Sequence, residues 1–216
     1  MKLYTKGKHI LCNGMLAFVG SMLLMACKAD IEPYPNLVTE FADMRTNTNG
    51  VFVSMTTDNG ARYGILNTNI APLMPDTTYR AVVGFVQKSV ASIPKAEIYT
   101  LAGVRVLADS TSTVLHHPTN IASMWQRGKY INMQLTALTQ GGTHHWGYAV
   151  DSVQTNGNNT HHHLSIHHNQ GKDPISYSQT YYASILLSSI PHYQMGDTIS
   201  VAVHTFGGIK KWMFCR

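Results

Sequence analysis

The alternation of apolar and polar residues along the chain predicts a protein built almost wholly of β-strands. The pattern is clearest over residues 130–138, where four apolar residues alternate with polar ones: Ile131, Met133, Leu135 and Ala137. Such alternation is typical of a strand with one buried face. We expect ten strands, over residues 51–55, 62–66, 78–86, 96–106, 130–138, 145–153, 161–168, 181–188, 197–205 and 210–214.

Turn-forming residues divide these strands into two groups. Asp58, Asn59 and Gly60 lie between the first two strands and favour a hairpin, because Asn and Gly tolerate the positive φ of tight turns. A polar stretch over residues 109–120 separates the fourth strand from the fifth. We therefore predict two all-β domains, with a small barrel over residues 39–115 and an antiparallel β-sandwich over residues 118–216.

The first 26 residues have the layout of a secretory signal peptide. Lys2, Lys6 and Lys8 supply a positive start, and residues 15–25 form an apolar run. The run is about half the ~20 residues that a membrane-spanning helix needs. We therefore expect the chain to be exported, with residues 27–38 forming a short polar tether that leads to the first domain.

Cys27 comes directly after the small residue Ala26, at the end of the apolar run. Residues 24–27 resemble the lipobox of bacterial lipoprotein precursors, in which the cysteine is acylated and the peptide bond before it is cut. The alternative is an ordinary signal peptide that is cut after Ala26 and leaves Cys27 unmodified. Because the lipobox explains the position of the cysteine, we predict a lipid anchor on Cys27, and two or more acyl chains hold a protein at a bilayer.

Removal of the signal peptide changes the charge of the chain. All eleven acidic residues follow Cys27, whereas three of the sixteen basic residues precede it, so the mature chain has a net charge of +2 in place of +5. A net charge this close to zero argues against nucleic-acid binding, which requires basic residues gathered on one face of the protein. Cys12 leaves with the signal and Cys27 carries lipid, so Cys215 has no partner and no disulfide framework is expected.

Several short motifs resemble those of the NigD-like lipoproteins of Bacteroidetes. In the second half they are Trp125, residues 128–132, residues 164–169, and Asp173, Pro174 and Tyr177; in the first half the motif is the turn at residues 58–62. The resemblance implies an OB-like N-terminal barrel, a C-terminal β-sandwich and attachment to the outer membrane, on its periplasmic or its cell-surface face. No shared catalytic activity or ligand defines the family, so the resemblance assigns no functional residues.

Histidines are the most unusual feature of the second half, and they are more frequent than the resemblance implies. If the apolar residues of the strand at 161–168 face the core, alternation places His161, His163 and His167 on its outer face, with neighbours roughly 6.5 to 7 Å apart. With His145 from a paired strand, imidazoles at this spacing can bind zinc, copper or nickel. The alternative is a polar outer face that binds no metal.

Exposed aromatic residues suggest a second kind of site. Trp125, Trp146 and Tyr177 are candidates for stacking on a glycan or for anchoring a peptide or an envelope protein. Catalysis is the least supported function, because the sequence has no Gly-x-Ser-x-Gly elbow and no His-Glu-x-x-His motif. We therefore interpret the chain as a non-catalytic binding module without a cofactor, and a histidine-based metal-binding protein is the alternative.

Ser110 is a candidate modification site. It lies between Asp109 and Thr111 in the predicted interdomain stretch. This sequence resembles the Asp-Ser/Thr sites at which Bacteroidetes O-glycosylate exported proteins. We expect the hydroxyl of Ser110 to carry a glycan if the stretch is exposed.

Overall fold

The computed structural model describes residues 36–67, 73–90, 93–110, 115–157 and 159–215. The predicted signal peptide, Cys27 and most of the predicted tether lie outside these residues. In the described part of the chain, no helix is both long and apolar enough to cross a membrane.

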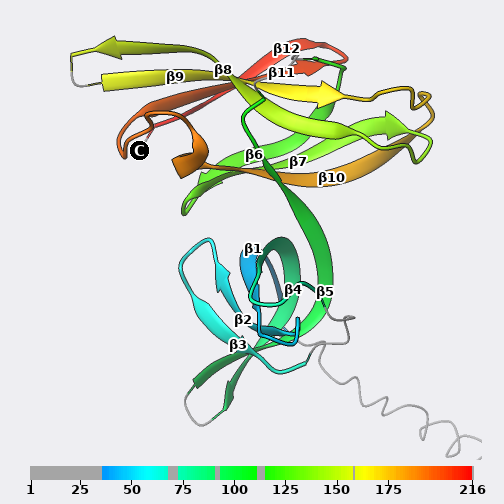
Figure 1. Cartoon of the computed structure of the whole chain (residues 1–216), viewed down its shortest axis with the longest axis vertical. Coiled ribbons are helices and arrows are strands. Elements are labelled where there is room, and N and C mark those ends of the chain that lie inside the picture. Colours follow the sequence, from blue (N-terminus) through cyan, green and yellow to red (C-terminus); the bar gives the residue numbers. More distant parts are fainter. Residues whose placement is uncertain (1–35, 68–72, 91–92, 111–114, 158, 216) are drawn as a thin grey trace, which may run out of the picture. The chain divides into compact units, whose positions relative to one another are not determined.

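The first five strands form a closed barrel (Figure 1). They are β1 (Leu37–Thr46), β2 (Phe52–Thr57), β3 (Arg62–Ile65), β4 (Thr78–Val90) and β5 (Ile93–Leu107). β1 pairs antiparallel with β2 and β4, while β3 closes the ring by pairing parallel with β5. The resulting circular order, β1-β2-β3-β5-β4, is the strand order of an OB barrel.

The remaining strands form two sheets that pack as a sandwich. They are β6 (Asn120–Arg127), β7 (Tyr130–Thr139), β8 (His145–Asn156), β9 (Asn159–Asn169), β10 (Tyr177–Leu186), β11 (Thr198–Thr205) and β12 (Gly208–Phe214), with a 3-10 turn, η2 (Leu187–Ser189), after β10. One sheet has the order β5-β10-β7-β6 and the other has the order β12-β11-β9-β8. The predicted all-β fold, a small barrel followed by a sandwich, is confirmed.

β5 belongs to both parts of the fold. Residues 93–103 pair with β4 in the barrel, and residues 104–107 pair parallel with residues 182–185 of β10 in the sandwich (Figure 1). The chain therefore passes from barrel to sandwich within one strand, and the polar stretch at residues 109–120 follows this passage.

Each part has its own hydrophobic core. Met44, Met55 and Phe85 are fully buried in the barrel, and the sandwich encloses a larger core that includes Tyr148 and Leu164. The alternation noted over residues 130–138 corresponds to β7, whose Ile131, Met133, Leu135 and Ala137 are at most 1% exposed. The apolar positions of the sequence pattern are therefore residues of the sandwich core.

The described residues contain twelve strands where the sequence pattern predicts ten. β1 was missed because its apolar and polar residues do not alternate: Phe41 and Ala42 are buried side by side, and charged residues flank them. β6 was missed because it is an edge strand whose pairing with β7 shifts register between Ile121 and Ser123. Both errors come from the same cause, since irregular strands lack the period of two.

Candidate functional site at the junction of barrel and sandwich

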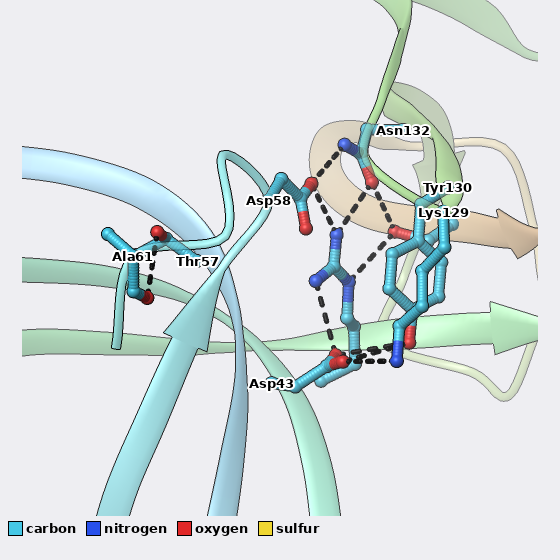
Figure 2. Close-up of polar contacts among 9 residues, drawn as sticks. Asp43, Thr57, Asp58, Ala61, Lys129, Tyr130 and Asn132 are labelled. Carbon is cyan, nitrogen blue, oxygen red and sulfur yellow. Dashed lines mark hydrogen bonds and ion pairs between the residues drawn. The ribbon is translucent and has the colours of Figure 1, made fainter. Parts of the chain in front are cut away.

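Arg80 of β4 is the centre of a buried polar cluster where the barrel meets the sandwich. Its side chain is 2% exposed, and two barrel carboxylates bind it. Asp43 of β1 lies 3.2 Å from Nη1, and Asp58 of the β2–β3 turn lies 2.6 Å from Nη2 (Figure 2). A buried guanidinium is strongly unfavourable unless it is paired and hydrogen-bonded, so these two acids make its burial possible.

The sandwich contributes the other half of the cluster. Asn132 of β7 accepts a hydrogen bond from Arg80 Nη2 at 3.0 Å and donates one to Asp58 at 2.6 Å. Ser184 of β10 donates to Asn132 at 2.7 Å. We name the residues Asp43, Asp58, Arg80, Lys129, Tyr130, Asn132 and Ser184 the clasp, because they join strands of both parts.

Tyr130 and Lys129 complete the clasp around Asp43. The centroid of the Tyr130 ring lies 3.7 Å from the Arg80 guanidinium carbon, and its hydroxyl donates to Asp43 at 3.1 Å. Lys129 Nζ lies 2.9 Å from the same carboxylate. Burial and the neighbouring Asp43 raise the pKa of Tyr130, and the hydrogen bond to Asp43 raises the pKa of Lys129. The clasp therefore holds two cations and two carboxylates that neutralise one another.

The β6–β7 turn fits closely against the β2–β3 turn. Gly128 has φ +57°, and a Cβ atom at this position would lie 2.6 Å from the backbone oxygen of Asp58. Gly60 has φ +88° in the hairpin that the sequence predicted. The turns at residues 58–62 and 128–132, two of the motifs that resemble NigD-like proteins, therefore meet at the clasp.

The clasp is flanked by two hollows that share Asp58 as a wall. The first hollow, of about 670 Å³, lies along the barrel strands β1, β2 and β3 and is lined by hydroxyl and charged side chains such as Arg45, Thr56, Arg62 and Lys129. The second hollow, of about 380 Å³, lies between β1 and β4 of the barrel and β6, β7 and β10 of the sandwich. Both volumes lie in the ~300–1,000 Å³ range of small-molecule sites.

Sequence reasoning placed none of the clasp residues in a site. Asn132 was expected on the solvent side of its strand, yet it is fully buried, because that face of the sandwich sheet packs against Arg80. The motifs that resemble NigD-like proteins contain Asp58, Lys129, Tyr130 and Asn132, so they are the one signal in the sequence that leads to the clasp.

The four histidines proposed as metal ligands do not converge. His161 and His163 are in contact, with ring centroids 4.0 Å apart. His145 pairs with Asn169, eight residues along β9 from His161 and roughly 26 Å away at ~3.3 Å per residue. In the described residues, no group of three or more His, Cys, Asp or Glu side chains is arranged to hold a metal ion.

The face of β9 that carries these histidines is partly covered. His167 is 8% exposed, because the segment at residues 115–117 crosses it and the Leu115 amide donates to His167 Nδ1 at 2.7 Å. Burial, followed by the proximity of other histidines, lowers the pKa of His161, His167 and His204. Burial against the sheet therefore disfavours protonation of these rings.

A second buried polar cluster was not expected from the sequence and lies inside the sandwich. His144 Nδ1 and His168 Nε2 are 2.9 Å apart, and both side chains are almost fully buried. His168 Nδ1 faces the His117 carbonyl at 2.9 Å, and His144 Nε2 faces Asp173 at 2.9 Å. We name His144, His168 and Asp173 the histidine chain.

The hydrogen bonds of the histidine chain determine which nitrogens donate. A carbonyl and a carboxylate only accept hydrogen bonds, so His168 Nδ1 donates to the His117 carbonyl and His144 Nε2 donates to Asp173. Hydrogen bonds from Thr139 and His144 lower the pKa of Asp173, and burial lowers the pKa of His168 to about 4.

The remaining predicted residues lie in different places. Trp146 stacks on His168 with ring centroids 3.9 Å apart, so it packs beside the sandwich core, while Tyr177 is 55% exposed at the start of β10. Trp125 is half-buried and lines the second hollow. Ser110 is half-buried, and its backbone amide donates to Tyr148.

Comparisons with known proteins identify the family. The sequence model described as "NigD-like C-terminal beta sandwich domain" matches residues 105–215. No curated protein matches the chain.

Three similar solved structures each align with 84% of this chain. They are a NigD-like immunity protein from Bacteroides caccae (18% identity, 98% of that chain, TM-score 0.63), a putative toxin-related protein from Parabacteroides distasonis (18%, 93%, 0.66) and a protein of unknown function from Bacteroides vulgatus (12%, 91%, 0.64). At these identities the likeness shows the fold alone. The family match spans half of the sequence and includes the motifs that carried the resemblance in the second half, so the chain belongs to the NigD-like family.

Proposed function

We propose that this chain is an exported lipoprotein of the outer membrane, anchored through Cys27, that acts as a non-catalytic binding module. The ligand site is the junction of barrel and sandwich. The observation that carries the proposal is the contrast between the clasp, whose polar groups are paired with one another, and the two open hollows beside it. A paired, rigid clasp holds the walls of both hollows in place, which lowers the cost of ordering them around a ligand.

The chemistry of the junction favours binding over catalysis. The clasp acids Asp43 and Asp58 are neutralised by Arg80 and Lys129, so they are poor general bases. Among the described residues, Ser165 Oγ donates to Asp151 at 2.8 Å and forms no hydrogen bond with a histidine, so the usual pairing of a serine nucleophile with an imidazole base is missing. Two proteins of similar structure are described as an immunity protein and a toxin-related protein, and both descriptions are compatible with a role in binding another molecule.

Crosslinking in intact cells tests the binding proposal. A photoreactive residue in place of Thr56, inside the first hollow, is expected to give a crosslinked product on irradiation. The same residue in place of Lys210, on the exposed strand β12, is the matched control and is expected to give none. Equal products at both positions, or no product at Thr56, would contradict the proposal.

A separate measurement tests the anchor. Intact mass of the membrane-extracted protein is expected to correspond to a chain that begins at Cys27 and carries acyl groups. The Cys27→Ser variant is expected to lose the acyl mass and to leave the membrane fraction. A wild-type protein without acyl groups would contradict the lipid anchor. The binding proposal would then depend on the crosslinking result alone.

A further inference from the structure

The second hollow occupies the same face of the sandwich sheet as the clasp. Trp125 of β6 lies opposite Asn132 of β7, which lies opposite Ser184 of β10, and the latter two are bound in the clasp. One row along, Gln134 lies opposite Tyr182, and both line the second hollow. Residues two apart on a strand share a face, so the clasp and the hollow are neighbouring rows of one surface.

Aromatic rings form one wall of the second hollow. Phe41 is buried, and its ring meets Trp125 at 5.2 Å and Tyr182 at 5.9 Å, in both cases edge to face. These contacts hold the two half-buried rings in fixed orientations. Trp125 and Tyr182 therefore form a rigid aromatic platform that remains partly open to solvent.

Polar side chains with unused hydrogen-bonding capacity surround this platform. Within the described residues, the side chains of Arg127 and Gln134 form no hydrogen bond or ion pair, and Glu40 accepts only a 3.4 Å contact from Asn59. Each of the three ends in a planar group with two or more adjacent donors or acceptors. This arrangement differs from the clasp, where the same kinds of groups are paired with one another.

The charges around the hollow favour a neutral ligand. Asp58 is bound to Arg80, which leaves one anion, Glu40, and one cation, Arg127, on the rim. A ligand with a net charge would be attracted by one of them and repelled by the other. An uncharged ligand with an apolar face and many hydroxyl groups can pack on the platform and form hydrogen bonds with the side chains of the rim.

We propose that the second hollow binds a pyranose ring of an uncharged glycan, an inference that rests on the proposed binding function and names its ligand class. The C–H face of a pyranose packs on an aromatic ring, because its hydrogens are attracted by the negative face of the π-system. Its neighbouring hydroxyls match the paired donors and acceptors of Glu40, Arg127 and Gln134. A hollow of about 380 Å³ is of the size that such small ligands occupy.

The test follows the indole N–H signals of the three tryptophans by NMR in the chain beginning at Lys28, which contains the whole compact unit of residues 36–216. The probes are the methyl glycosides of glucose, galactose, mannose and N-acetylglucosamine, and the β-1,4-linked disaccharides of glucose and of N-acetylglucosamine. At least one is expected to shift the Trp125 signal saturably while the Trp146 and Trp212 signals stay in place. Trp125→Phe assigns the signal.

Variants and a matched probe make the result specific. Trp125→Ala is expected to weaken binding at least ~10-fold and Gln134→Ala several-fold, whereas Tyr177→Ala, an exposed aromatic away from the hollow, is expected to leave it unchanged. Sorbitol, which has the hydroxyls of glucose but no ring face, is expected to cause no saturable shift. Gln134 is half-buried and outside the clasp, so its variant tests the site even if Trp125→Ala fails to fold.

Three outcomes would overturn the glycan proposal: no saturable shift with any pyranoside, an equal shift with sorbitol, or undiminished binding in Trp125→Ala or Gln134→Ala. If a crosslink at Thr56 is still observed in cells, such an outcome contradicts the glycan proposal but not the proposed binding function. If the crosslink is also absent, both proposals fail together.

Discussion

The clasp and the histidine chain are both polar clusters in the interior of the fold, but they differ in how they respond to pH. The clasp is built around the side chain of Arg80, and a guanidinium does not titrate in proteins. The histidine chain is built on imidazoles, and burial lowers the pKa of His168 to about 4. The comparison teaches that the junction is organised around a group that does not titrate, while the sandwich contains buried groups that do.

Loss of Arg80 is expected to have the largest effect on stability. Arg80→Met leaves the half-buried Asp43 and Asp58 without their main partner, and breaking a pair of this kind costs about 3–5 kcal/mol of unfolding free energy. Urea unfolding measures the change.

Two further variants sharpen the test of the clasp. The double variant Arg80→Met/Asp58→Asn is expected to recover part of the loss, because it removes one of the unpaired charges. Lys129→Ala is the control and is expected to cost under ~1 kcal/mol, since its side chain is 64% exposed. A cost for Arg80→Met no greater than that for Lys129→Ala would show that the clasp does not stabilise the fold.

A smaller loss is expected from Gly128→Ala. The positive φ and the approach of the new Cβ to the Asp58 oxygen together predict about 1–3 kcal/mol of destabilisation. Gly157→Ala is the matched control, because Gly157 also has positive φ (+61°) but its Cβ would meet nothing within 4 Å. The difference between the two variants in urea unfolding isolates the fit between the turns, and equal losses would assign the effect to φ alone.

The histidines predict the pH dependence of stability. His161, His167, His168 and His204 have pKa values that burial lowers in the folded state, so below pH 6.5 the unfolded chain binds more protons than the folded one. Their contribution is fully present above pH 6.5 and is lost as the pH falls toward 4, by about 1.4 kcal/mol per pH unit for each proton.

Denaturation at several pH values measures this slope. His168→Leu is expected to reduce the slope between pH 6.5 and 4, whereas Tyr177→Ala, at an exposed residue outside both clusters, is expected to leave it unchanged. A slope that is the same in His168→Leu and the wild type would break the distinction between the two clusters.

Of all these changes, metal addition is expected to have the smallest effect on the stability of the protein. Only His161 and His163 of the four proposed ligands are in contact, and two imidazoles make an incomplete zinc site. An equimolar amount of zinc is therefore expected to raise the melting temperature little, and equally in the wild type and in His161→Ala/His163→Ala. A large rise that the double variant abolishes would restore the metal-binding interpretation.

The fold was predictable from the sequence to the extent that strands obey regular alternation. β7 and β9 were found because their core residues recur at every second position, and β1 and β6 were missed because bulges and paired apolar residues interrupt that period. The order of strands around the barrel came from the family resemblance, since alternation carries no information about pairing partners.

The candidate site was much less predictable. Arg80 and Ser184 are 104 positions apart, and nothing in either local sequence signals that they meet. Trp146 and Trp125 look alike in the sequence, yet one packs on a buried histidine and the other lines a hollow. Such roles depend on which surfaces face one another, and that is a property of the tertiary structure alone.

The continuous strand β5 has a consequence for how the chain folds. Residues 93–103 complete the barrel by pairing with strands that precede β5, but residues 104–107 pair only with residues 182–185 of β10, 78 positions further along the chain. Until residue 185 is available, these last four residues of β5 are an unpaired edge, and long-range parallel pairing is slow to form. We therefore expect the barrel to form early and the sandwich late, with a transient intermediate whose exposed strand edge is prone to aggregation.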